Sequence, residues 1–104
     1  MIIVNTPTIQ NSSITTVHGI ARGSTVRARN FGSDIFAGLK NLIGGEISEY
    51  TKLQADSREQ ALKRMEEDAR KMGANAIVNV RITTSMVMQG ACEILTYGTA
   101  VTVD

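Results

Sequence analysis

The amino-acid sequence predicts an α+β fold in which one long helix packs on an antiparallel sheet, as a single domain over residues 1–104. Three observations lead to this prediction. Apolar residues recur at spacings of three and four between Ala61 and Met72, which is the period of an amphipathic helix. From Ala76 onward they alternate with other residues, as in a strand. A length of 104 residues suits one hydrophobic core.

The first part of the chain is predicted to form strands. The short apolar run Ile2–Val4 precedes Pro7 and suits an edge strand, because proline cannot donate to a ladder. The segment from Ile14 to about Arg29 is rich in Thr, Val and Ile, which favour a strand. Gly19 and Gly23 interrupt it, so we expect this strand to bulge or bend there.

Two helices are predicted in the middle of the chain. The first is short, at Asp34–Ile43, and ends at a glycine pair. The second runs from about Ile47 to Met72, and capping-box patterns at Asp56 and Ser57 leave a bend open there. Acid-before-base pairs four residues apart mark its exposed side. Gly73 is expected to end this helix in the left-handed conformation.

The last part of the chain is predicted to form two strands joined at Gln89 and Gly90. In the first strand the even-numbered residues from Ala76 to Ile82 form an apolar face, which we expect to meet the helix. In the second strand, which ends near Val103, neither face is polar. Because one long helix covers only one face of a sheet, we expect identical subunits to complete its edges and its other face.

Composition narrows the classes of function. Eleven Lys and Arg against ten Asp and Glu give a net charge of +1, which argues against nucleic acid or an anionic membrane as the partner. One cysteine excludes an intramolecular disulfide framework and suits a reducing compartment. The start of the chain lacks the pattern of a secretory signal, and no stretch is apolar enough to cross a bilayer. These features predict a soluble cytoplasmic protein.

Four segments carry a resemblance to a known family: RGSTVRARN at Arg22–Asn30, DIFAGLKNLIGGE at Asp34–Glu46, GANAIVNVR at Gly73–Arg81 and YGTAV at Tyr97–Val101. In this order, and over nearly the whole chain, they resemble the YbjQ family of small uncharacterised bacterial and archaeal proteins. The resemblance implies a dodecin-like β-α-β-β subunit in a ring-shaped homo-oligomer, a pentamer. The family carries a heavy-metal-binding label, although no ligand motif accompanies it in this sequence.

The potential metal ligands of the chain are a histidine and several sulfur-bearing side chains. His18, Cys92, Met86 and Met88 offer nitrogen and sulfur atoms, and sulfur selects soft ions such as Cu(I). Their spacing does not match the paired ligands of a structural zinc site. We therefore expect the methionines to pack in the core or at an interface, and His18 to be a hydrogen-bonded strand residue. A metal would be bound across a symmetry axis, and its identity stays open.

A second candidate site combines strand arginines with the glycine pair. Arginine forks suit phosphate or carboxylate groups. The alternative is that the arginines form salt bridges between subunits, while the glycines only join two helices, since no lysine follows them to make a phosphate loop. The candidate residues for ligand binding or for a subunit interface are Arg22, Arg27, Arg29, Gly44, Gly45 and Glu46.

Catalysis has the weakest signal in the sequence. Nucleophilic catalysis needs a nucleophile beside an oriented base, and the single histidine has no recognisable nucleophile motif near it. The leading hypothesis is non-enzymatic binding of a metal ion or small anionic ligand at a symmetric site between subunits. The alternatives are a purely structural interaction module, or a small enzyme whose active site combines His18, Cys92 or Glu46 from two chains.

Overall fold

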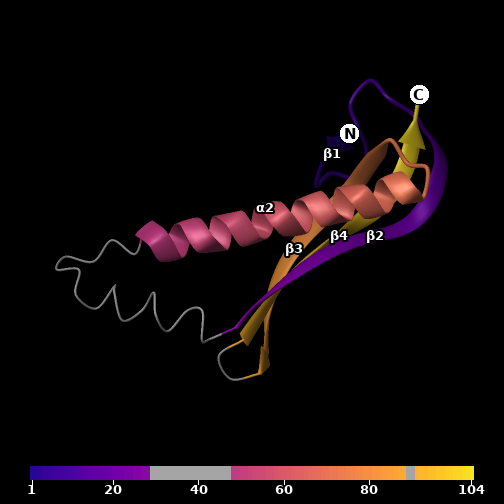
Figure 1. The fold of residues 1–104 in the computed structure, drawn as a ribbon. Helices are drawn as coiled ribbons and strands as arrows, with labels where there is room; N and C mark the ends of the chain where they lie inside the picture. Colours follow the sequence, from indigo (N-terminus) through magenta and orange to yellow (C-terminus); the bar gives the residue numbers. More distant parts are fainter. Residues whose placement is uncertain (29–47, 89–90) are drawn as a thin grey trace, which may run out of the picture.

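The structure is a computed structural model that describes residues 1–28, 48–88 and 91–104. At residues 27–28, 48–54 and 87 the description covers the backbone. It confirms the α+β class and the β-α-β-β order (Figure 1). The described elements are β1 (Ile2–Ile3), β2 (Ile14–Ala28), α2 (Ser48–Lys71), β3 (Ala76–Met88) and β4 (Ala91–Val103). Both the short helix predicted at Asp34–Ile43 and the turn predicted at Gln89 and Gly90 lie outside the described residues.

The described strands form one sheet in the order β1-β3-β4-β2. β4 pairs antiparallel with both β2 and β3, as the sequence predicts for the long strands. β1 differs, since it joins β3 in parallel through the pairs Ile2–Ala76 and Ile3–Ile77. The sheet is therefore mixed, and β2 forms its edge on the side away from β1.

Apolar residues gather on both faces of the sheet. Under α2 lies a cluster that includes Met65, Ile77 and Ala100, each of them fully buried. On the opposite face lies a second, smaller cluster of Ala76, Val78, Val101 and Val103, and the N-terminal residues Val4 and Ile9 pack against it. The helix thus covers one face, and the N-terminal segment covers only one end of the other.

A bulge in β3 changes which residues face the helix. Asn79 has a φ of 54°, and the pairing with β4 shifts between Val78 and Arg81. The backbone N–H of Asn79 donates to Thr6 O at 2.9 Å, which ties the bulge to the N-terminal segment. Because one extra residue reverses the alternation, Ile77 and Val80 share the helix-side cluster, while Val78 joins the opposite one. The prediction that the even-numbered residues of β3 face the helix is therefore wrong for Ala76 and Val78, which precede the bulge, and is confirmed for Val80, which follows it.

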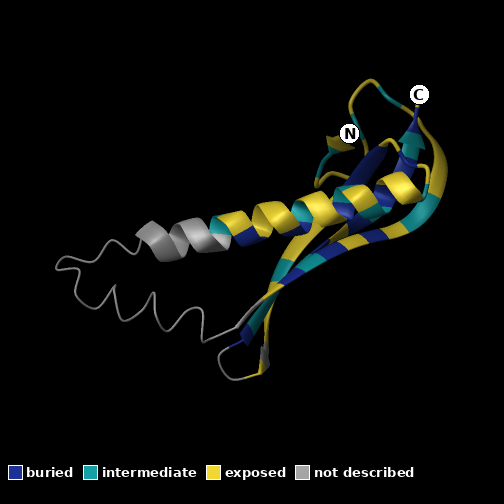
Figure 2. Cartoon of the chain, in the orientation of Figure 1, coloured by how far each residue is buried: buried dark blue, intermediate teal, exposed yellow. Residues whose placement is uncertain are grey.

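The long helix is a single continuous element from Ser48 to Lys71, within one residue of the predicted bounds. Ser57 is fully buried inside it, so the capping pattern there does not start a helix. Alanine and methionine at helical spacing turn toward the sheet, and Ala61, Met65 and Ala69 are all fully buried (Figure 2). Small side chains allow the helix to approach the strands closely.

The closest approach of α2 to the sheet occurs at Gly23 of β2. A Cβ atom on this residue would lie 2.3 Å from both Ala61 O and Met65 N, which are backbone atoms of the helix. The hydroxyl of Thr96 lies beside the contact, 3.1 Å from Gly23 O and 2.8 Å from Ala61 O. The register with β4 is regular from Gly19 to Ala28, so no bulge lies at Gly23. The predicted irregularity at Gly19 is confirmed by a register shift after Val17.

The helix also covers part of the outer edge of β2. The carboxylate of Asp68 accepts a hydrogen bond from the backbone N–H of Arg22 at 3.0 Å. The guanidinium group of Arg64 donates to Ser24 O at 2.6 Å. Backbone groups at a sheet edge are otherwise free to pair with another strand, so these contacts close the edge at residues 22–24.

The end of α2 has the predicted glycine cap. Gly73 has a φ of +91°, its N–H donates to Arg70 O at 3.0 Å, and the N–H of Ala74 donates to Ala69 O at 3.1 Å. These bonds satisfy helix carbonyl groups that would otherwise lack a partner.

Replacing Gly23 by Ala is expected to lower the free energy of unfolding by about 3 kcal/mol, at the upper end of overpacking costs, because both clashing atoms belong to the backbone and no side chain can move aside. Urea denaturation followed by circular dichroism would measure the change. A variant as stable as the wild type would show that α2 does not rest on Gly23.

Replacing Gly73 by Ala tests backbone conformation without a steric clash. The nearest atom to the added Cβ would be His18 Cε1 at 3.8 Å, an ordinary contact, so only the positive φ opposes the substitution. We expect a loss of about 1 kcal/mol in the same urea experiment. A loss of stability as large as that of Gly23→Ala would contradict the expectation that the positive φ alone opposes Gly73→Ala.

Candidate functional site

A hollow of about 650 Å³ lies between the N-terminal segment and the outer edge of β3. Its lining is formed by Ile3, Val4, Asn5, Thr6, Pro7, Val80, Arg81 and Ile82. Arg81 is the one charged residue in this set, so the hollow has no acid and base that could act together in catalysis.

Two of the predicted metal ligands lie opposite each other near the end of the β3–β4 hairpin. Met86 and Cys92 are cross-strand partners, and the register shift that follows pairs Met88 with Ala91. Side chains of directly paired residues have Cβ atoms about 4.5–5.5 Å apart, so the two sulfur atoms can reach one ion. Met86 is 73% exposed and Cys92 is half-buried. Of the two expected locations of these methionines, the core of the chain is wrong for Met86 and for Met88, which is also exposed, while packing at an interface stays a prediction.

His18 is far from these sulfur atoms in the fold. Its Nε2 atom lies 2.7 Å from the hydroxyl oxygen of Thr102, and its ring lies near Gly73 at the end of α2. The expectation of a hydrogen-bonded strand residue is therefore confirmed. In the part of the chain that the structure describes, no three His, Cys, Asp or Glu residues come together as a metal cluster.

The predicted arginine set is divided by the structure. Arg22 is exposed and lies opposite Tyr97 of β4. The backbone of Arg27 pairs with Cys92, five positions further along β2. The other members, Arg29, Gly44, Gly45 and Glu46, lie outside the described residues, so the combined arginine and glycine site stays a prediction.

Sequence reasoning missed Arg81. This residue of β3 is the partner of Tyr97 on the side opposite to Arg22, so Tyr97 is flanked by two arginines. The Nη1 atom of Arg81 donates to Asn5 O and to Val80 O, each at 2.9 Å. The sequence places Arg22 and Arg81 far apart, and the bulge at Asn79 determines the register, so no local pattern could have paired them.

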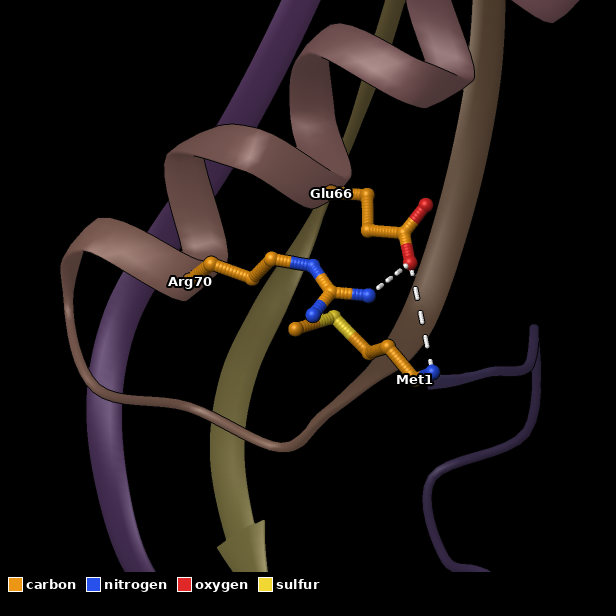
Figure 3. A network of polar contacts seen from close by, with 3 residues as sticks. All are labelled: Met1, Glu66 and Arg70. Atoms are coloured by element: carbon orange, nitrogen blue, oxygen red, sulfur yellow. Dashed lines mark hydrogen bonds and ion pairs between the residues drawn. The ribbon is translucent and has the colours of Figure 1, made fainter.

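A cluster of charges ties the N-terminal residue to α2 (Figure 3). The carboxylate of Glu66 accepts a hydrogen bond from Arg70 at 2.8 Å, and the amino group of Met1 lies 3.9 Å from the same oxygen atom. The hydrogen bond from Arg70 is the main cause that holds the pKa of Glu66 below its ordinary value of 4.5. Both partners are cations that stabilise the ionised carboxylate, so the cluster supports the fold and supplies no proton donor for catalysis.

The described helix carries too many charged residues to qualify as a membrane span.

These observations define a small α+β protein with one long helix on a mixed sheet, and the comparisons identify its family. The chain belongs to the YbjQ family, whose model, described as "Putative heavy-metal-binding", matches residues 1–104. A solved structure from Pediococcus pentosaceus, a protein with unknown function of the DUF74 family, is similar with a TM-score of 0.61 over 100% of this chain and 98% of that chain. At 17% sequence identity this likeness shows the fold alone.

Relatives from archaea and bacteria are similar over their whole length. A UPF0145 protein of Methanosarcina acetivorans is 57% identical over 97% of this chain and 95% of its own. A UPF0145 protein of Pyrococcus furiosus is 53% identical over 100% of this chain and 91% of its own, and one of Hahella chejuensis is 52% identical over 100% of both chains. The names of these relatives state no activity.

The charge cluster makes stability depend on pH. Since the folded state lowers the pKa of Glu66, its ionised form stabilises the fold above the ordinary pKa of 4.5, and this contribution is lost as the pH falls through the lower folded value. Glu66→Gln should therefore destabilise the protein at pH 7, by less than about 1 kcal/mol for such a partly exposed pair, and should match the wild type in strong acid.

Urea denaturation at pH 7 and at a series of lower pH values would measure this difference. Glu67→Gln is the matched control, because Glu67 is exposed and forms no salt bridge with the residues that the structure describes. Equal effects of the two substitutions at pH 7 would contradict a specific role for the cluster.

Proposed function

We propose that this chain is a non-enzymatic protein that binds a soft metal ion at the end of the β3–β4 hairpin and acts as a homo-oligomer. The observation that carries the proposal is the direct cross-strand pairing of Met86 with Cys92. The description of the family as heavy-metal-binding supports the same class of ligand.

The chemistry of the donors suits a soft ion. A cysteine thiolate and a methionine thioether favour Cu(I) and similar thiophilic ions, whereas magnesium and calcium prefer oxygen ligands. Met86 is exposed, so its thioether can turn toward an incoming ion without opening the core. Its unbranched side chain has three rotatable bonds, which lets the sulfur atom adjust to the position of Cys92.

Two sulfur atoms from one chain leave room for further ligands around the ion. Met88 lies near the same end of the hairpin and is 67% exposed, but it pairs with Ala91, which alternates to the sheet face opposite to that of Cys92, so further donors must come from elsewhere. A second subunit would supply the same donors again by symmetry, and an inter-subunit site of this kind needs no dense ligand motif in one chain.

The open sheet surface supports association of identical chains. Val17, Ile20 and Val26 of β2 are 64%, 61% and 58% exposed, and their cross-strand partners place them on the face turned away from α2. Exposed apolar residues on one sheet face are typical of protein–protein contacts. The family resemblance of the sequence implies a ring of five subunits.

Native mass spectrometry of the untagged, reduced protein with added Ag(I) would test metal binding and assembly together. Ag(I) is the probe because it is soft and keeps its oxidation state. We expect an oligomer with at most one Ag(I) for every two subunits, because each ion takes donors from at least two chains. Cys92→Ser should abolish binding, and Met86→Leu should weaken it about tenfold, which corresponds to about 1.4 kcal/mol for one thioether bond.

His18→Ala and Met72→Leu are the controls, since neither residue lies at the hairpin end, and both variants should bind Ag(I) as the wild type does. Loss of binding in His18→Ala, or unchanged binding in Cys92→Ser, would place the metal elsewhere. Normal binding of Ag(I) by a monomeric protein would support the proposed metal site and contradict the proposed homo-oligomer.

A further inference from the structure

Two arginines flank a tyrosine on the sheet face turned away from α2. Tyr97 of β4 has Arg22 as its partner on β2 and Arg81 as its partner on β3. The adjacent residues Gly23 and Thr96 contact the helix, and alternation along the strands therefore turns the row of Arg22, Tyr97 and Arg81 to the other face. All three side chains are exposed, with Tyr97 at 38%.

One of the two guanidinium groups is held in position. Nη1 of Arg81 donates to the backbone oxygen atoms of Asn5 and Val80, each at 2.9 Å. No described residue accepts a hydrogen bond from its Nε or Nη2 atoms. The fork of Arg81 is thus oriented by the protein while two of its nitrogen atoms remain available, which lowers the entropic cost of binding an anion.

The acids near this row do not neutralise it. Neither arginine forms a salt bridge with the residues that the structure describes. Asp68 lies beside Arg22, but its carboxylate is engaged by the backbone N–H of that residue. Glu93, on the same face, lies four positions from Tyr97 along β4 and pairs with Val26 and Ser85. Neither arginine therefore has an ion-pair partner among the described residues, and Glu93 is the acid that shares their face.

We propose that Arg22, Tyr97 and Arg81 form a binding site for a small phosphate-class oxyanion that carries two or more negative charges, such as a diphosphate. The Cα atoms of the two arginines lie on strands separated by about 10 Å, twice the spacing between neighbouring strands. Arginine side chains are long enough to converge from both sides above Tyr97. Each guanidinium fork can then donate two parallel hydrogen bonds to one end of the anion.

The geometry favours phosphate over carboxylate. A carboxylate has two oxygen atoms in one plane and is filled by one bidentate arginine, whereas a phosphate group offers several oxygen atoms in different directions. Two forks that approach from opposite sides match the second arrangement. The hydroxyl group of Tyr97, between the arginines, can donate a further hydrogen bond. This site is independent of the proposed metal site, since the two share no residue.

Isothermal titration calorimetry of the full chain with pyrophosphate, at about 0.1 M ionic strength, tests the proposal. We expect saturable binding by the wild type, and a loss of affinity of about tenfold or more in Arg22→Gln and in Arg81→Gln. Arg22→Lys should also weaken binding, because it keeps the charge but loses the fork. The control is Arg58→Gln, which removes the same charge from an exposed position on α2 and should bind normally.

Arg22→Gln decides the outcome if Arg81→Gln disturbs the fold, because Arg81 also holds the N-terminal segment through Asn5. Circular dichroism of each variant distinguishes the two effects. No binding of pyrophosphate by the wild type, or an equal loss in Arg22→Gln and Arg58→Gln, would overturn the site. Succinate is the comparison ligand, and binding as tight as that of pyrophosphate would overturn the assignment to phosphate.

Discussion

The arrangement of this protein depends on the direct contact between the backbone of α2 and the backbone of β2 at Gly23. A side chain of any size there would meet the helix atoms Ala61 O and Met65 N. Because the helix lies so close, its charged residues reach the outer edge of β2, where Asp68 and Arg64 bind backbone groups. A single small residue thus determines both the packing of the helix and the protection of part of the sheet edge.

Among the described residues, much of the sheet face opposite to α2 is uncovered, and the two proposed sites lie on that face and at the hairpin end. Val4 and Ile9 cover only the end of that face near the chain termini. Beyond them, apolar residues of β2 stand beside the row of Arg22, Tyr97 and Arg81. A surface with this composition suits an interface or a ligand site. The sulfur atoms near the hairpin end suit a different ligand, so the two proposals can be tested separately.

Bulges in β3 determine which residues meet across the sheet. With a turn at residues 89–90, a regular hairpin would pair Val87 with Cys92, but the irregularity near the end places Met86 there instead. The bulge at Asn79 shifts the register again, so that Val78 pairs with Thr99. Each bulge inserts one extra residue into β3, so the cross-strand partners on its two sides differ in register by one position. Both candidate sites therefore rest on features that local sequence patterns do not reveal.

The sequence by itself determined the α+β class, the helix bounds within one residue and the cap at Gly73, because periodicity and turn chemistry act between neighbours in the chain. Only the tertiary structure decided that Met86 faces Cys92, that His18 lies apart from them, and that Arg81 completes the row with Arg22. Those relations depend on strand register, which is set by the packing of distant segments, by bulges and by the close approach of the helix.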